Sequence, residues 1–293
     1  MRLSYIVTLA MEDNNPSNET VTFLGTGGAR FMIVSQMLAS GGLWLNLNGT
    51  EILIDPGPGC IVQSTKRKFK AEKLSAIILS HRHLDHSADV NIMVEAMTQS
   101  GFNRHGRLFA PADALETDSV IFSYLKDYLD GVEILREGKS YLIGNISFTT
   151  PVRHIHPVET YGMVFRTDKH AFSYIADTRH FNGLCQQYGG ELLIINLVFL
   201  EPRPSTGSLS MPTDHLSVPD VRHIIEELKP KVAILTHFGV SVWRAKPWLI
   251  ADRLSQQTGI KVIAAWDGMR FDLLRLDSSA LPGNDGGDDN LRQ

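Results

Sequence analysis

The chain has 293 residues, 43% of them hydrophobic and 20% charged, which is typical of a globular protein large enough to bury a substantial core. Its formal net charge of −4 gives no general attraction to nucleic acid or to an anionic membrane, so we expect neither strong non-specific nucleic-acid binding nor a membrane partner. The two cysteines, Cys60 and Cys185, are far apart in sequence, which argues against a disulfide framework and favours a cytoplasmic location.

The two ends of the chain differ in composition from the rest. Segment 1–18 is predicted to be a flexible N-terminal extension, because its second half is polar. Segment 277–293 contains four aspartates and three glycines, which predicts a disordered acidic tail. Residues 19–276 show neither a repeat nor a linker, so we expect one compact domain there.

Short apolar runs separated by turn residues predict many strands. In chain order the expected strands are Val21–Leu24, Leu43–Leu47, Glu51–Asp55, Ala76–Leu79, Arg107–Ala110, Val132–Leu135, Ser140–Thr149, Tyr161–Arg166, Ala171–Ala176, Leu192–Val198, Val232–Leu235, Val262–Ala264 and Arg270–Arg275. Asn48-Gly49, between the second and third strands, is a strong signal for a two-residue hairpin turn.

Apolar residues at helical spacing predict three helices, at residues 87–97, 118–130 and 217–229. Ser87 is the expected N-cap of the first helix, and Gly131 is expected to stop the second. Pro219 lies in the first turn of the third helix, and Pro230 follows its end. Many strands with single helices between them predict an α/β fold built in layers.

The run His81-Arg82-His83-Leu84-Asp85-His86 is the most informative feature of the chain. It places four potential metal ligands within six residues, directly after an apolar strand. Imidazole and carboxylate together suit zinc and its first-row neighbours. Alternate residues of an extended segment face the same way, so His81, His83 and Asp85 are expected on one side and His86 on the other. One short loop would then supply ligands to two adjacent metals.

Two metals need about seven ligands, so the remaining ligands must come from segments distant in sequence. Three places qualify, because each has an imidazole or a carboxylate just after a predicted strand. These candidates are His154 and His156, Asp177, and His237.

The glycine-rich segment 25–28 invites comparison with nucleotide-binding loops. A P-loop would require a following Lys-Ser or Lys-Thr, and the dinucleotide-binding pattern needs a glycine where Arg30 stands. We therefore expect a tight turn near the metals. Arg30, Arg179 and Arg203 are candidates for contacting a substrate phosphate, with a solvated surface position as the alternative for each.

Taken in order, these motifs resemble those of the metallo-β-lactamase-fold hydrolases. The likeness is greatest to the branch that holds ribonuclease Z and the phosphoribosyl cyclic phosphodiesterases. The segments that carry it are 23–29, 53–57, 81–86, 177–178, 214–217, 236–237 and 267–269. The resemblance implies a four-layer αββα sandwich, in which helices flank two mixed β-sheets.

The resemblance also implies two divalent metals. Their ligands would be His81, His83 and His156 on the first metal, Asp85, His86 and His237 on the second, and Asp177 bridging the two. Asp55 would support a ligand imidazole through a hydrogen bond. Zinc is the expected metal, and manganese or iron is also compatible because every ligand is a nitrogen or an oxygen.

The same resemblance assigns the catalytic residues. A hydroxide bridging the metals would attack the substrate, with Asp85 and Asp177 holding the metals and His215 serving the leaving group as an acid. The alternative for His215 is a position beside a helix cap, since Asp214 and Ser217 are both capping residue types.

Two histidines compete for the third position on the first metal. The branch has a histidine, four residues, an aromatic residue and a glycine, and His156 with Tyr161-Gly162 fits that spacing. His154 does not fit it, and is expected to contact a ligand or the substrate, or to lie on the surface.

The substrate is predicted from what the chain lacks. The interval from His156 to Asp177 is too short for the long arm with which ribonuclease Z enzymes grip tRNA. This favours a phosphodiesterase acting on a small, cyclic or nucleotide-like phosphodiester. The alternatives are a ribonuclease Z-like RNA 3′-processing endonuclease, a hydrolase of a thioester, lactone or amide bond, and lastly a non-catalytic metal-binding module. The insertion at 91–137 could form a lid or rim over the metals, and a homodimer is the oligomer to test for.

Overall fold

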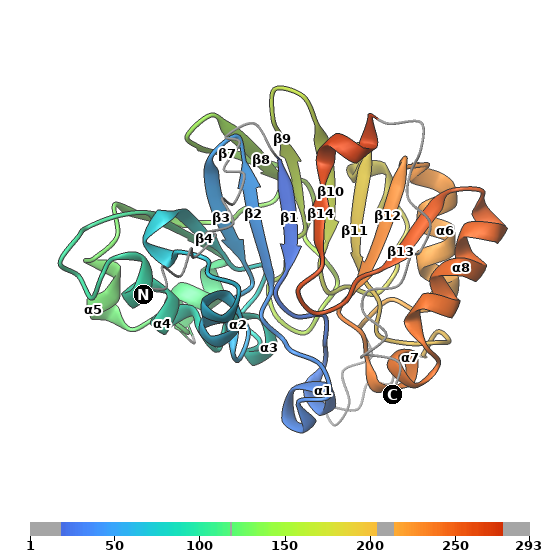
Figure 1. The fold of residues 1–293 in the computed structure, drawn as a ribbon, viewed down its shortest axis with the longest axis horizontal. Helices are drawn as coiled ribbons and strands as arrows, with labels where there is room; N and C mark the ends of the chain where they lie inside the picture. Colours follow the sequence, from blue (N-terminus) through green and yellow to red (C-terminus); the bar gives the residue numbers. More distant parts are fainter. Residues whose placement is uncertain (1–18, 118, 204–213, 278–293) are drawn as a thin grey trace, which may run out of the picture.

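The computed structural model describes residues 19–117, 119–203 and 214–277. The predicted extension at 1–18, and the predicted tail beyond Asp277, lie outside the described residues. Two mixed seven-stranded sheets pack face to face, and helices cover their outer faces (Figure 1). The predicted αββα sandwich is confirmed.

The first sheet has the order β14-β1-β2-β3-β4-β5-β6. Its strands are β14 (Arg270–Asp272), β1 (Thr20–Phe23), β2 (Leu43–Leu47), β3 (Thr50–Ile54), β4 (Leu74–Ile78), β5 (Arg107–Ala110) and β6 (Gly131–Ile134). The strands from β3 to β6 run parallel, and the pairs from β14 to β3 are antiparallel. Asn48 and Gly49 join β2 to β3 with φ values of 52° and 84°, so the predicted hairpin turn is confirmed.

The second sheet has the order β13-β12-β11-β10-β9-β8-β7. Its strands are β13 (Lys261–Ala264), β12 (Val232–Thr236), β11 (Leu192–Asn196), β10 (Ala171–Ile175), β9 (Met163–Arg166), β8 (Ile146–Thr150) and β7 (Lys139–Ile143). The prediction of one strand at 140–149 is wrong, because the chain reverses at Gly144-Asn145 and Ser140 pairs with Thr149 across the hairpin.

The helices are α1 (Arg30–Ser35), α2 (Cys60–Lys66), α3 (Leu84–Ser87), α4 (Val90–Met97), α5 (Ser123–Lys126), α6 (Val218–Leu228), α7 (Val240–Arg244) and α8 (Pro247–Thr258). Short 3₁₀ turns lie at η1 (Ala71–Lys73), η3 (Cys185–Gln187) and η4 (Leu273–Leu276), and a π-helical turn lies at η2 (Asp113–Thr117). None of the described helices combines the length and apolarity needed to span a bilayer.

The third predicted helix is confirmed as α6. Ser217 is its N-cap, and a capping box joins Ser217 to Asp220. Lys229 ends the helix in the left-handed conformation just before Pro230. Val221, Ile224 and Ile225 form the apolar face that packs against the second sheet.

The other two helix predictions need correction. The prediction of a helix at 118–130 is wrong, because α5 is the only helix among residues 119–130. The side chain of Asn91 donates to the Val120 carbonyl and accepts from the Phe122 N–H, and so replaces helical hydrogen bonds. Ser87 does not cap α4, which begins after Asp89. Its hydroxyl donates instead to the carbonyls of Arg82 and His83.

Most of the insertion at 91–137 packs on the outer face of the first sheet. Val94, Leu115 and Leu125 are buried there with residues of β4 and β5. Asp113 connects the insertion to the metal-ligand motif, because Arg82 Nε donates to its carboxylate at 3.0 Å. The insertion therefore supports this motif from the side.

A hydrophobic core also lies between the two sheets. Phe109, Phe148, Phe165 and Phe172 are fully buried and stack or meet edge to face. At one edge of this core, the carboxyl ends of β3, β4, β10, β11 and β12 come together beside α1, α3 and α7 (Figure 1). Most of the predicted site residues follow these strand ends, while His154 and His156 follow β8 and His215 precedes α6.

Candidate metal centre

The motif after β4 divides between two clusters of potential ligands. His81 lies in the loop after the strand, and His83 precedes the single helical turn α3. Because Leu84–Ser87 is helical, Asp85 and His86 lie on one turn, and both face the second cluster. The expected placement of Asp85 beside His81 and His83 is therefore wrong. The motif nevertheless contributes to two sites.

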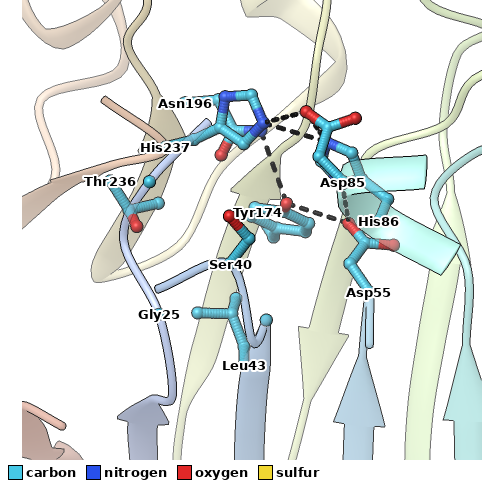
Figure 2. Close-up of a pocket in the computed structure, with 12 residues that line it drawn as sticks. Gly25, Ser40, Leu43, Asp55, Asp85, His86, Tyr174, Asn196, Thr236 and His237 are labelled. Atoms are coloured by element: carbon cyan, nitrogen blue, oxygen red, sulfur yellow. Dashed lines mark hydrogen bonds and ion pairs between the residues drawn. The ribbon is translucent and has the colours of Figure 1, made fainter. Parts of the chain in front are cut away.

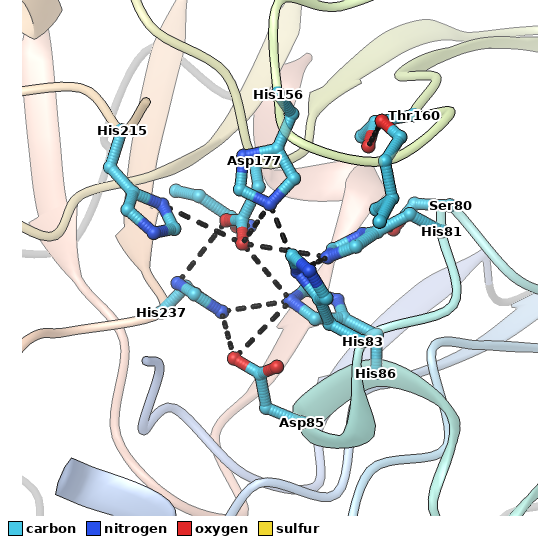
Figure 3. Close-up of polar contacts among 12 residues, drawn as sticks. Ser80, His81, His83, Asp85, His86, His156, Thr160, Asp177, His215 and His237 are labelled. Carbon is cyan, nitrogen blue, oxygen red and sulfur yellow. Dashed lines mark hydrogen bonds and ion pairs between the residues drawn. The ribbon is translucent and has the colours of Figure 1, made fainter. Parts of the chain in front are cut away.

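The first cluster consists of three ring nitrogens from His81, His83 and His156 (Figure 3). Nδ1 of His83 lies 3.1 Å from Nε2 of His81 and 3.0 Å from Nε2 of His156. His156 donates from Nδ1 to the Asp214 carbonyl, so its Nε2 carries a lone pair. His81 donates from Nδ1 to the Ser80 hydroxyl, which itself donates to Asp55, so Nε2 of His81 also carries a lone pair.

Converging lone pairs fit a cation. Nitrogen ligands about 2.0–2.1 Å from a tetrahedral metal lie about 3.4 Å apart, close to the spacing of this cluster. Burial lowers the pKa of His81 and of His83, and lowers that of His156 to about 3. All three imidazoles are therefore neutral, as metal ligands must be.

The second cluster contains Asp85, His86, His237 and Asp177. The Nε2 atoms of His86 and His237 are 2.9 Å apart, and Asp85 Oδ2 lies 3.3 Å from Nε2 of His237. Asp177 lies between the clusters, with Oδ2 3.7 Å from His81 Nε2 and 3.4 Å from His86 Nε2 (Figure 3). The structure thus brings together all seven predicted ligands.

Charges within the second cluster oppose the effect of burial. Burial alone would raise the carboxyl pKa values of Asp85 and Asp177, but the neighbouring histidines lower both below the usual range. Burial would lower the pKa of His86, yet the carboxylates of Asp55, Asp85 and Asp177 raise it well above its usual value. Without a metal, His86 holds a proton that a metal would displace.

Asp55 supports the cluster from beneath, as predicted. It has a left-handed backbone with φ 54° and accepts hydrogen bonds from the Ser80 N–H at 2.6 Å and from His86 Nδ1 at 2.9 Å. The bond from His86 leaves Nε2 of that ring facing the metal position. Figure 2 shows Asp55 and His86 on one side of a pocket, with Tyr174 beside them.

The structure separates the two candidates for the third position. Both nitrogens of His154 are engaged away from the cluster, because Nδ1 donates to the Asp177 carbonyl at 3.1 Å and Nε2 accepts from the Tyr188 hydroxyl at 2.6 Å. Burial lowers the pKa of His154 to about 4, which keeps that ring neutral. His156 alone presents a lone pair to the cluster, in support of its predicted role.

His215 lies at the open side of the cluster. Its Nδ1 is 3.6 Å from Asp177 Oδ2 and has no hydrogen-bond partner among the described residues. The ring meets those of His156 and Phe199 edge to face. Because Ser217 and Asp220 form the cap of α6, the helix start gives His215 no capping role.

The glycine-rich segment forms the predicted turn beside the cluster. A Cβ on Gly28 would lie 2.1 Å from His237 Nδ1, so only glycine fits there. The next residue, Ala29, donates its N–H to Asp85 Oδ2 at 3.1 Å. Asp267, from the closing motif, accepts from Thr26 N and from Ala39 N, both at 2.8 Å, and so holds the turn in place.

The three candidate arginines lie outside the ligand cluster. Arg179 Nε is 3.9 Å from Asp214 Oδ1, and the Arg203 guanidinium lies 4.2 Å from the centre of the Phe199 ring. Arg30 is exposed at the start of α1. Arg179 and Arg203 thus lie on the side of His215.

Three residues around the cluster were not predicted: Ser80, Tyr174 and Asn196. Asn196 is a buried amide at the end of an apolar strand, and such a residue is itself a signal. Ser80 and Tyr174 stand in segments that supplied ligands, but nothing in the sequence distinguishes them from ordinary strand residues.

The fold and the converging ligands are those of a metal-dependent hydrolase. The chain matches the model of the beta-lactamase superfamily domain over residues 50–238, and it belongs to that superfamily, in the branch that includes ribonuclease Z. The uncharacterized protein MJ1374 of Methanocaldococcus jannaschii is 30% identical over 263 residues, which are 87% of this chain and 95% of that protein. Ribonuclease Z of Methanosarcina mazei is 28% identical over 131 residues, 42% of each chain.

Solved structures agree on the fold. The metallo-β-lactamase-fold protein YhfI of Bacillus subtilis superposes with a TM-score of 0.72 at 22% identity, over 87% of this chain and 99% of that one. A diphosphatase from the PhnP family superposes with a TM-score of 0.62 at 20% identity, over 87% of this chain and 97% of that one.

Proposed function

We propose that the protein is a metal-dependent phosphodiesterase that hydrolyses a small, cyclic or nucleotide-like phosphodiester. The observation that carries the proposal is the position of His215. Its Nδ1 lies 3.6 Å from Oδ2 of Asp177. The candidate ligands around that carboxylate offer only nitrogen and oxygen atoms. Diester hydrolysis needs both positive charge at phosphorus and a proton for the leaving alkoxide.

The seven clustered side chains would hold two divalent metals. His81, His83 and His156 would hold one ion and Asp85, His86 and His237 the other, while Asp177 lies near ligands of both groups. When bound, two such ions lower the pKa of water to about 7 and neutralise charge on the non-bridging phosphate oxygens. Zinc is the metal we expect, with manganese or iron as alternatives.

His215 would give a proton from its ring to the leaving oxygen. Its side chain is 11% exposed, so it can reach a bound substrate and exchange protons with solvent. Asp177 and the rings of His156 and Phe199 restrict its orientation. A positioned acid of this kind typically contributes about 10²–10⁴-fold to the rate.

The substrate is inferred from the surroundings of the cluster. Between His156 and Asp177 the chain forms only a short loop and the hairpin of β9 and β10, so no arm extends from this interval. The similarity to ribonuclease Z of Methanosarcina mazei supports RNA 3′-processing as a second candidate. The net charge of −4 weighs against a long polyanionic substrate.

One panel of substrates tests the proposal. The protein, loaded with zinc and separately with manganese, is assayed on bis-p-nitrophenyl phosphate, a 2′,3′-cyclic nucleotide, a precursor tRNA, a thioester and a lactone. We expect turnover of the two small diesters and none of the thioester or lactone. Cleavage confined to the precursor tRNA would favour the ribonuclease Z-like alternative. Turnover confined to the thioester or lactone would overturn a phosphodiesterase.

A further inference from the structure

Two buried polar residues connect the two clusters of candidate metal ligands without belonging to either cluster. Tyr174 lies in β10 and Asn196 ends β11, and their exposed fractions are 4% and 3%. Figure 2 shows both side chains in the pocket bordered by His86 and His237. A buried amide and a buried phenol are costly unless they are hydrogen-bonded, so their partners indicate what they do.

Asn196 holds the Asp177 carboxylate by one of its two oxygens. Its Nδ2 donates to Asp177 Oδ1 at 2.9 Å. Oδ1 also lies 3.4 Å from His237 Nδ1, whereas Oδ2 lies 3.4 Å from His86 Nε2 and 3.6 Å from His215 Nδ1. Without the amide, the carboxylate would lose the hydrogen bond that distinguishes its two oxygens.

Tyr174 acts on the other support of the site. Its hydroxyl donates to Asp55 Oδ2 at 3.1 Å, and it accepts a longer contact of 3.5 Å from Asn196 Nδ2. Asp55 holds His86 directly, and it holds His81 through the Ser80 hydroxyl. Tyr174 is therefore joined to one ligand of each metal.

A single hydrogen-bonded path thus joins both clusters and the carboxylate between them. It runs from Asp177 through Asn196 and Tyr174 to Asp55. From Asp55 it divides, to His86 in the second cluster and through Ser80 to His81 in the first. Groups that orient metal ligands in this way typically change metal affinity about 10- to 100-fold.

We propose that Asn196 and Tyr174 are positioning residues that set the affinities of the two metal sites together. Removing either polar group, neither of which belongs to a ligand cluster, weakens both sites in parallel because each site has a ligand on the path. The proposal is independent of the bond that the enzyme hydrolyses. It requires only that the seven side chains bind metal.

The experiment measures metal binding in Tyr174→Phe and Asn196→Ser. Each protein is stripped with a chelator and titrated with Zn²⁺ against a chromophoric competitor, which gives two dissociation constants. We expect both constants to rise about 10- to 100-fold. Melting temperatures of the metal-free proteins are recorded alongside.

Two remote variants serve as matched controls. Tyr141 has a buried hydroxyl that accepts from Arg136 N and donates to Ile134 O, and Tyr141→Phe removes the same group far from the metals. Asn91→Ser removes an amide that holds the segment before α5. We expect both controls to lower the melting temperature of the metal-free protein and to leave both zinc constants unchanged.

The outcomes are separable. Two weakened sites in Tyr174→Phe, with a loss of melting temperature no larger than in Tyr141→Phe, support positioning. Zinc constants within threefold of the wild-type values, or weakening of one site alone, overturn it. Equal weakening in Tyr141→Phe also overturns it, since the effect would then be general destabilisation. If Asn196→Ser does not fold, Tyr174→Phe decides the question alone.

Discussion

A histidine can bind a metal only through a nitrogen whose lone pair is free, and this decides between His154 and His156. His156 donates from Nδ1 to the Asp214 carbonyl, and its Nε2 faces the cluster. His154 uses both nitrogens, on the Asp177 carbonyl and the Tyr188 hydroxyl. Two histidines separated by one residue therefore have different tasks.

The first prediction concerns this pair. We expect His156→Ala to bind one metal fewer than the wild type, and His154→Ala to keep the full complement with somewhat weaker binding, because its ring orients the Asp177 backbone. Elemental analysis after dialysis counts the metals. A full metal load in His156→Ala, or a loss of one equivalent in His154→Ala, would show that the assignment is reversed.

The second prediction concerns the proton donor. His215→Ala should lower kcat on a diester with a poor leaving group by about 10²–10⁴-fold, because the leaving alkoxide loses its acid. The loss should be much smaller for p-nitrophenolate, which needs no proton. His223→Ala, a half-exposed ring on α6, is the control and should retain wild-type rates. Equal losses of kcat on both kinds of leaving group would show that His215 is not the acid.

Elements differ in how far sequence alone predicts them, and the difference depends on where the deciding contacts lie. The β2–β3 hairpin and α6 are predicted because their signals are local: Asn48-Gly49 in the turn, and Pro219 near the helix start. The helix at 118–130 fails because Asn91, distant in sequence, binds the backbone there. Gly144-Asn145 is also a local turn signal, and the prediction of one strand at 140–149 overlooks it.

The metal site shows the same limit. The ligand motif and the polar residues after apolar strands identify the seven candidate ligands that the structure brings together, because metal chemistry restricts which residue types can serve. Asn196 carries a signal, an amide at the end of an apolar strand, but its partner Asp177 is evident only once β10 and β11 lie side by side. Tyr174 carries no such signal. A tyrosine in a strand is ordinary until its hydroxyl is found beneath a buried carboxylate.

The third prediction tests the glycine-rich turn as an element. In Gly28→Ala the new methyl group would have to occupy the space of the His237 ring, since its nearest atom there is 2.1 Å away. We expect the affinity of the second metal site to fall at least tenfold, by zinc titration, with the first site retained. Gly189→Ala, where nothing lies within 4 Å, is the matched control. Unchanged zinc affinity in Gly28→Ala would mean that the turn moves freely away from His237.

For the whole molecule, the cluster is where the two sheets are held together at one edge. The candidate ligands follow β4 in the first sheet and β8, β10 and β12 in the second sheet, so a bound metal would join both layers. A ligand that binds only the folded state stabilises it, by about 2.7 kcal/mol at a free concentration 100 times its dissociation constant. Metal removal should therefore lower the melting temperature of the entire domain in one transition.

The stabilisation by a bound metal should depend on pH, and the pKa of His86 determines whether it grows or shrinks as the pH rises. Its pKa is raised well above the usual value because Asp55, Asp85 and Asp177 outweigh its burial. Below that raised pKa, a metal must displace the proton from His86. Each unit by which the pH falls therefore lowers the apparent metal affinity by up to about tenfold through this group. In the metal-free protein the same proton contributes stability that is complete below the usual pKa and is lost as the pH rises through the raised one. The melting temperature gained on adding zinc should therefore increase from pH 6 to pH 8, as scanning calorimetry with and without chelator would measure. A gain that is constant across this range would mean that His86 is not protonated before the metal binds.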